Sequence, residues 1–258
     1  MLEILLVIAV AAGASLLTFF SGFGLGTMLL PVFLLFFPVD LAIAMTAVIH
    51  FLNNIFKTGL IGGHAVRDVV LKFGIPAFLF AFLGAKVLAY LASFPIRIPY
   101  KLFGFPLTTT LVNVVIGLLL LIFAIVEIVP SKNKKPIKDI GLAIGGAVSG
   151  FFGGVSGHQG ALRSGFLIRL GLSKEAFVAT GILISLFVDI SRLGVYWTNL
   201  PLSELGDHKW TLLAALLAAF TGAIIGRRML KKVTLRVLQY FVAAGISVIG
   251  VLLIIGAI

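Results

Sequence analysis

The sequence predicts an all-α polytopic membrane protein of about eight to ten segments, arranged as two inverted-topology repeats that each contain a short half-helix or re-entrant hairpin. Of the 258 residues, 60% are hydrophobic and only 11% are charged, and the mean hydropathy is +1.21. Soluble domains carry about 25% charged residues, so a soluble globular fold is excluded. Because each crossing takes about 20 residues, the membrane segments leave no room for a large extramembrane domain.

Apolar runs separated by proline, glycine and charged residues predict ten segments. They cover residues 2–20, 24–37, 41–62, 69–92, 104–128, 139–155, 159–170, 175–198, 209–227 and 235–257. Two of them, 24–37 and 159–170, are too short to cross a hydrocarbon core of about 30 Å at about 1.5 Å per residue. Each follows a glycine-rich break, so each is expected to be a half-helix or one arm of a re-entrant hairpin.

An internal duplication is indicated by polar and glycine positions that recur with an offset of 135 residues. This offset places Ser21-Gly22 on Ser156-Gly157, Asp40 on Glu175, Asn54 on Asp189, Lys57 on Arg192 and Gly59 on Gly194. A lysine-rich linker, 129–138, divides the chain into a first repeat at 1–128 and a second at 139–258. Because each repeat has an odd number of segments, the halves are expected to have opposite orientations, the usual framework of secondary transporters.

The loop charges predict the orientation, since cytoplasmic loops collect lysine and arginine. One side carries three such residues, namely Arg97, Lys101 and Lys209. The other carries 13: Arg67, Lys72, Lys132, Lys134, Lys135, Lys138, Arg169, Lys174, Arg227, Arg228, Lys231, Lys232 and Arg236. The linker is therefore expected in the cytoplasm and both termini outside, in a prokaryotic inner membrane. Contact with membrane lipid head groups explains the net charge of +11, so nucleic acid is not expected as a partner.

Both glycine-rich breaks place small residues at the start of a short helix. An exposed helix start offers unpaired backbone N–H groups and a positive dipole end, and both attract an anion. Two such starts pointing inward from inverted halves predict an anion cradle near mid-membrane. Its candidate substrate-binding residues are Ser21, Gly22 and Gly24 in the first break, and Ser156, Gly157, His158, Gln159 and Arg163 in the second. Two alternatives stay open: the glycines serve close helix packing, and Arg163 snorkels to the cytoplasmic interface.

The third segment of each half ends in polar residues spaced by three, four and seven positions, which predicts a polar stripe on one helix face. The stripes consist of His50, Asn53, Asn54 and Lys57 in the first half, and Ser185, Asp189 and Arg192 in the second. The two asparagines are predicted to line the cradle, and the other residues to line a pathway or couple transport to protons. For proton coupling, the titratable candidates are Asp189, His50 and His158. A structural alternative is that Asp189 and Arg192 neutralise each other while Lys57 snorkels.

The excess of cations in the polar stripes and breaks over the single carboxylate favours an anionic solute. These motifs resemble the TauE/SafE family of sulfite-exporter-type membrane permeases, over essentially the whole chain. The resemblance lies in the breaks "SGFGLGTMLLP" and "SGFFGGVSGHQGALRSGF", in the acidic residue that follows each, and in the cation and glycine that close the third segment. It implies a transporter of small sulfur anions such as sulfite, sulfoacetate or related sulfonates. Because the first break has no ionisable residue, the second half is expected to contribute more substrate contacts.

Alternating access by a secondary transporter is the leading hypothesis, and an anion channel is one alternative. A membrane-embedded lipid phosphatase that uses Ser156, His158 and Arg163 is the other, although no carboxylate stands near that motif in the sequence. No enzymatic activity, cofactor or metal is expected, and the chain has no cysteine. A homodimer, the identity of the anion and the direction of transport stay open. The residues expected in an interfacial aromatic belt are Tyr196, Trp197 and Trp210.

Overall fold

The computed structural model describes residues 2–21, 24–94, 96–102, 104–128, 139–199, 202–229 and 236–258. These residues form α1 (Leu2–Ser21), α2 (Leu25–Leu34), α3 (Val39–Ile61), α4 (Arg67–Ala92), α5 (Leu111–Ile128), α6 (Asp139–Ser156), α7 (Gly160–Leu167), α8 (Lys174–Asn199), α9 (Lys209–Met229) and α10 (Arg236–Ile254). The helices match the predicted segments in number and order. The linker 129–138, Gly22 and the side chain of Ser21 lie outside the described part.

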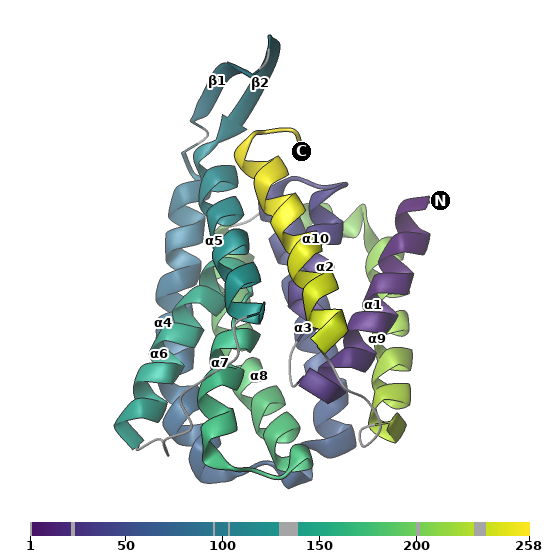
Figure 1. The fold of residues 1–258 in the computed structure, drawn as a ribbon, viewed down its shortest axis with the longest axis vertical. Helices are drawn as coiled ribbons and strands as arrows, with labels where there is room; N and C mark the ends of the chain where they lie inside the picture. Colours follow the sequence, from purple (N-terminus) through teal and green to yellow (C-terminus); the bar gives the residue numbers. More distant parts are fainter. Residues whose placement is uncertain are drawn as a thin grey trace.

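The two short helices, α2 and α7, turn back toward the end of the bundle from which the preceding helix came (Figure 1). α1 starts at the end that carries the β-hairpin, and α2 returns to that end. α6 starts at the opposite end, and α7 returns there. With 10 and 8 residues, α2 and α7 are too short to cross a membrane. Each is therefore one arm of a helical hairpin, and the two hairpins come from opposite ends.

Five described helical segments are long and apolar enough to cross a membrane: Val39–His64, Arg67–Ala92, Asp139–Ser156, Lys174–Asn199 and Lys209–Met229. The outer surface carries many large apolar side chains, such as Leu79 and Ile125 with exposed fractions of 56% and 63%. An apolar surface of this extent suits lipid and not water. The chain is therefore an all-α, multi-pass integral membrane protein.

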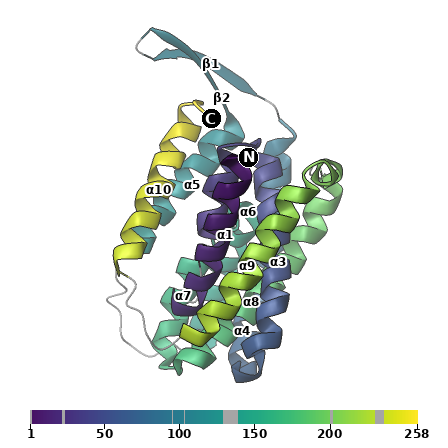
Figure 2. The same cartoon turned by 90° about the vertical axis from the view of Figure 1, so that its right-hand side faces the viewer.

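Small residues let the helices pack closely in two places. α4 packs against α6, and on the other side of the bundle α1 packs against α9 (Figures 1 and 2). A Cβ added at Gly154 of α6 would lie 2.1 Å from the carbonyl oxygen of Ala81, and one at Gly222 of α9 would lie 2.1 Å from that of Ala12. The glycines inside these helices therefore serve backbone contact, as small residues commonly do in membrane bundles.

Gly154→Ala is expected to lower the apparent melting temperature of the purified protein, because its methyl group would overlap the Ala81 carbonyl; overpacking of this kind costs roughly 1–3 kcal/mol. The matched control is Gly194→Ala in α8, where an added Cβ meets nothing within 4 Å. There the substitution is expected to stabilise the helix by up to about 1 kcal/mol. Equal melting temperatures for the two variants would contradict the packing interpretation.

One predicted helix, 104–128, is wrong at its start. Residues Phe105–Thr110 form strand β2, which pairs antiparallel with β1 (Arg97–Leu102), and α5 begins only at Leu111. The physical reason is local: Pro106 cannot donate a helical hydrogen bond, and three consecutive threonines are β-branched. Hydropathy alone does not separate such a strand from the apolar helix that follows it.

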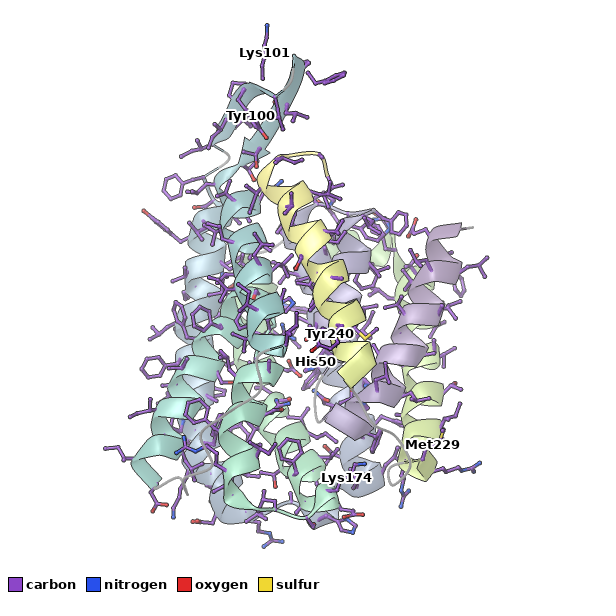
Figure 3. All side chains as sticks on the ribbon, viewed as in Figure 1. His50, Tyr100, Lys101, Lys174, Met229 and Tyr240 are labelled. Atoms are coloured by element: carbon purple, nitrogen blue, oxygen red, sulfur yellow. The ribbon has the colours of Figure 1, made fainter. Side chains whose placement is uncertain are left out.

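The two ends of the bundle carry different charges and different chain ends. The hairpin with Tyr100 and Lys101, the start of α1 and the end of α10 lie at one end, whereas Lys174 and Met229 lie at the other (Figures 1 and 3). At this second end Lys72 forms ion pairs with Asp68 at 2.9 Å and with Asp139 at 2.8 Å. The described cations predicted to be cytoplasmic lie at this end. Which end faces the cytoplasm stays a prediction.

Candidate functional site

The two glycine-rich breaks meet inside the bundle. Gly24 precedes α2 with a φ of 134°, and Gly157 joins α6 to α7 with a φ of 80°, both values that favour glycine. A Cβ added at Gly26, in the first turn of α2, would lie 3.5 Å from the carbonyl oxygen of Gly157 and 3.7 Å from the imidazole of His50. The first turn of α2 therefore touches the second break and α3, as the predicted cradle requires.

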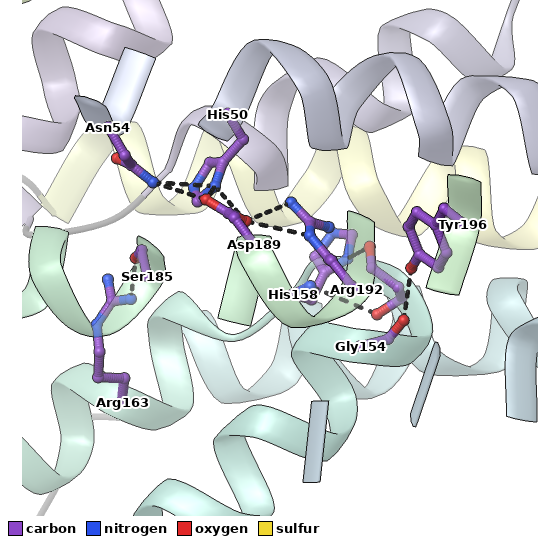
Figure 4. Close-up of polar contacts among 10 residues, drawn as sticks. His50, Asn54, Gly154, His158, Arg163, Ser185, Asp189, Arg192 and Tyr196 are labelled. Carbon is purple, nitrogen blue, oxygen red and sulfur yellow. Dashed lines mark hydrogen bonds and ion pairs between the residues drawn. The ribbon is translucent and has the colours of Figure 1, made fainter. Parts of the chain in front are cut away.

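Asp189, in the middle of α8, is the centre of a buried hydrogen-bond network (Figure 4). His50 Nδ1 lies 2.7 Å and 3.0 Å from its two carboxylate oxygens, and the Asn54 amide donates to one of them at 3.0 Å. Arg192 donates from Nε at 3.1 Å and from Nη2 at 2.8 Å. The exposed fractions of Asp189, Arg192 and Asn54 are 0%, 1% and 3%. The intrahelical ion pair is therefore present, but it belongs to a network that joins α3 to α8.

One nitrogen of the Arg192 guanidinium has no hydrogen-bond partner. Nη1 is buried and makes no hydrogen bond within the described residues, and a Cβ added at Gly157 would lie 2.6 Å from it. Leaving a buried donor without an acceptor costs about 1–3 kcal/mol, and more for a charged group. Such an atom therefore needs an explanation, and an anion held between Arg192 and the second break would supply the acceptor.

His158 and Gln159 bring further unpaired polar atoms to the second break. Their exposed fractions are 2% and 1%. His158 Nδ1 lies 3.1 Å from the carbonyl oxygen of Ser156, and the ring stacks on Phe123 with centroids 5.5 Å apart. In the described part of the chain, His158 Nε2 and both side-chain polar atoms of Gln159 lack partners. The break is thus lined by polar groups that the surrounding protein does not satisfy.

Arg163 does not extend to the interface, so the snorkelling alternative is wrong. Its exposed fraction is 2%, and its guanidinium donates to the hydroxyl of Ser185, one turn before Asp189 on α8 (Figure 4). Arg163 therefore ties α7 to α8 beside the network. The phosphatase alternative gains no support from this geometry, since the Ser156 hydroxyl donates to the carbonyl oxygen of Phe152 at 3.2 Å and not to a base.

Lys57 and Asn53 lie on the side of α3 that faces α1. Lys57 has an exposed fraction of 0%, so it does not snorkel. Its Nζ lies 5.5 Å from the centroid of the Phe19 ring and has no hydrogen-bond partner among the described residues. A desolvated cation–π contact contributes about 2 kcal/mol, whereas burying an ion costs several kcal/mol. The ring alone therefore does not compensate the ammonium. The Asn53 Oδ1 accepts a hydrogen bond from Ser15 at 3.3 Å.

Tyr196 is a site residue that the aromatic-belt prediction misplaced. Trp197 and Trp210 are 77% and 68% exposed, as a belt requires, but Tyr196 is 0% exposed. Its hydroxyl donates to the carbonyl oxygen of Gly154, which braces α8 against the end of α6 (Figure 4). The signal was present in the sequence, because Tyr196 follows Arg192 by four positions and so continues the polar stripe of α8.

Two helical hairpins that meet at glycine-rich breaks, with buried cations around them and an apolar outer surface, are typical of the membrane transporter class. A model of the sulfite exporter TauE/SafE family matches residues 6–253, and the chain belongs to this family. The resemblance read from the breaks is thus confirmed, and membership in this family implies a sulfur-anion transporter of the membrane. No curated protein and no solved structure matches the chain. The described residues contain no group of His, Asp and Glu that could hold a metal ion.

Proposed function

We propose that the chain is a secondary transporter that moves a small organic or inorganic sulfur anion, such as sulfite, sulfoacetate or a related sulfonate, by alternating access. The anion binds where the two breaks meet. The observation that carries this proposal is the unpaired Arg192 Nη1 beside Gly157, with unpaired atoms of His158 and Gln159 around the same break. An oxyanion offers several acceptor oxygens and a negative charge, which are the partners these groups lack.

The balance of buried charges supports an anion over a cation. Among the described residues, three buried cations, Lys57, Arg163 and Arg192, stand against one buried carboxylate, Asp189. Uncompensated charge inside a membrane is costly and is usually found on substrate or ion pathways. A bound anion lowers this cost, whereas a bound cation would raise it.

A contact between equivalent residues supports the inverted repeats, 1–128 and 139–258. Asn54 and Asp189, which the sequence offset pairs with each other, are hydrogen-bonded at 3.0 Å and are separated by 135 positions. Equivalent residues of two repeats touch when both lie at the axis that relates the repeats. The hairpins α1–α2 and α6–α7 come from opposite ends (Figure 1), as an axis in the membrane plane requires. Rocking of one repeat against the other about this axis would change the side from which the anion is accessible.

The orientation in the membrane follows from the positive-inside rule. We propose that the end with Lys174 faces the cytoplasm of a prokaryotic cell, and that the hairpin and both termini lie outside. Proton coupling is assigned to the contact between His50 and Asp189, because ionisable side chains inside a membrane domain are commonly the members of proton relays. Lys57, Arg163 and Ser185 line the route between the central site and the cytoplasm.

Ligand-induced thermal stabilisation of the detergent-purified protein tests the proposal. The panel contains sulfite, sulfate, thiosulfate, sulfoacetate, taurine, acetate and phosphate, and for comparison a lipid phosphate and an inorganic cation. A ligand that binds only the folded state at 100 times its Kd stabilises it by about 2.7 kcal/mol. We expect one sulfur anion to stabilise the wild type, and His158→Ala to lose most of this shift.

His64→Ala is the matched control, because His64 is an exposed histidine in the 3-10 turn (Gly62–His64) that follows α3, outside the site. This variant is expected to respond like the wild type. No response to any sulfur anion, together with a clear response to a lipid phosphate or a cation, would contradict the proposal.

Recordings in planar bilayers separate a carrier from a channel. Saturable flux without unitary currents supports alternating access, and stepwise single-channel currents would refute it.

A further inference from the structure

The polar residues of α3 face two different neighbours. His50 and Asn54 contact Asp189 of α8. Asn53 instead accepts a hydrogen bond from Ser15 of α1, and Lys57 lies over the ring of Phe19, near the end of α1. The α1 side of α3 is therefore a second polar surface, separate from the network that surrounds Arg192.

This second surface has donors but lacks acceptors. Lys57 Nζ and Asn53 Nδ2 are both buried, and within the described part of the chain neither has a hydrogen-bond partner. Both residues have exposed fractions of 0%. They are four positions apart, and this spacing places their side chains one above the other on a helix. The Asn53 oxygen is already occupied by Ser15, so the amide nitrogen is the atom left to bind a ligand.

Lys57 also lacks a counter-ion. Asp189 is the buried carboxylate of the described residues, and its ion pairs are with His50 and Arg192. Within the described residues, the Lys57 ammonium forms neither an ion pair nor a hydrogen bond. The Phe19 ring offers its face but no charge. A small anion would supply both the negative charge and the hydrogen-bond acceptors that the Lys57 amino group lacks.

We propose that Lys57 and Asn53 form a second anion site between α1 and α3, which binds a small inorganic oxyanion separately from the site at Gly157. The ammonium supplies the charge and up to three N–H groups, and the Asn53 amide supplies a further N–H group. Phe19 and the surrounding apolar side chains exclude water. The site mirrors the one at Gly157, since Lys57 and Arg192 occupy equivalent positions in the two halves.

The location of the second site gives it a role in the transport cycle, and this role rests on the proposed function, whereas the binding does not. α3 runs from the hairpin end to the opposite end of the bundle (Figure 1). Lys57 is four residues from the end of α3 at Ile61, further along than Asn54. An anion at Lys57 therefore lies between the central site and the cation-rich end. Two anions are bound at once, one at Gly157 and one at Lys57.

Isothermal titration of the full-length protein in detergent with sulfite, and separately with sulfate, tests the proposal by counting sites. The wild type is expected to bind two anions. Lys57→Met is expected to bind one and to melt at a higher temperature without ligand, because an unpaired buried charge has been removed. Lys57→Arg is expected to retain both sites with an affinity changed by less than about tenfold. If Lys57→Met does not yield folded protein, Lys57→Gln and Asn53→Leu replace it, and each is expected to bind one anion.

Lys86→Met is the matched control, because the Lys86 ammonium also lies over a phenylalanine ring, Phe82, at 5.7 Å, but on an exposed part of α4. It is expected to keep both sites. One wild-type site that survives Lys57→Met and disappears in Gly157→Ala would overturn the second site and leave the proposed function standing. One wild-type site that disappears in Lys57→Met and survives Gly157→Ala would support the second site and overturn the central one.

Discussion

Asp189→Asn is expected to destabilise the protein by roughly 3–5 kcal/mol, because removing one partner of a buried ion pair leaves the other charge uncompensated. Asp189 accepts hydrogen bonds from Asn54 and Arg192 and contacts His50. Asparagine has nearly the same shape, so packing changes little and the effect reports the charge. The measurement is thermal unfolding of the purified variant without ligand.

Two further variants make this prediction specific. Asp139→Asn also breaks an ion pair, to Lys72 at 2.8 Å, but the Asp139 side chain is 73% exposed, so the expected loss is below about 1 kcal/mol. The double variant Asp189→Asn/Arg192→Met removes both buried charges and is expected to regain much of the stability, yet not anion binding, because Arg192 Nη1 is gone. If Asp189→Asn and Asp139→Asn have the same melting temperature, the buried network does not hold α3 to α8.

Most of the fold could be predicted because the features that determine the helices, apolar runs and glycine-rich breaks, lie within short stretches of sequence. Apolar runs set the helices, and glycine-rich breaks set the two short ones: the predicted 139–155 is Asp139–Ser156, and the predicted 159–170 contains Gly160–Leu167. The strand Phe105–Thr110 was missed because an apolar strand next to an apolar helix has no hydropathy boundary. β-Branched residues and proline gave the only local signal there.

Apart from Tyr196, the residues that line the candidate site could be proposed from the sequence, but their partners could not. The repeat offset paired Asn54 with Asp189, and these two are hydrogen-bonded. The spacing of the first polar stripe predicts a single helix face, whereas Asn53 faces α1 and Asn54 faces α8. Neighbouring residues on a helix are about 100° apart, at about 3.6 residues per turn. Adjacent polar residues therefore serve two interfaces when a helix lies between two others, and only the three-dimensional arrangement shows which.

Gly157→Ala is expected to reduce anion binding at the central site by at least about tenfold while leaving a folded protein. The added Cβ would lie 2.6 Å from Arg192 Nη1. Because this nitrogen is the far end of a long side chain, it is expected to move away and carry its N–H group out of the break. The methyl group also occupies the space where an anion would approach the backbone. Titration with sulfite or sulfoacetate measures the loss.

Backbone strain is a competing cause of any effect, since Gly157 has a φ of 80° and a left-handed conformation costs an alanine about 1–2 kcal/mol. Gly171→Ala separates the two causes. Gly171 has a φ of 62° and an added Cβ there meets nothing within 4 Å, so this variant carries the strain without the contact. Both variants are expected to lose similar stability, and only Gly157→Ala to lose binding. Equal binding in the two variants would place the anion away from Arg192 and the second break, because only the Cβ added at Gly157 meets Arg192.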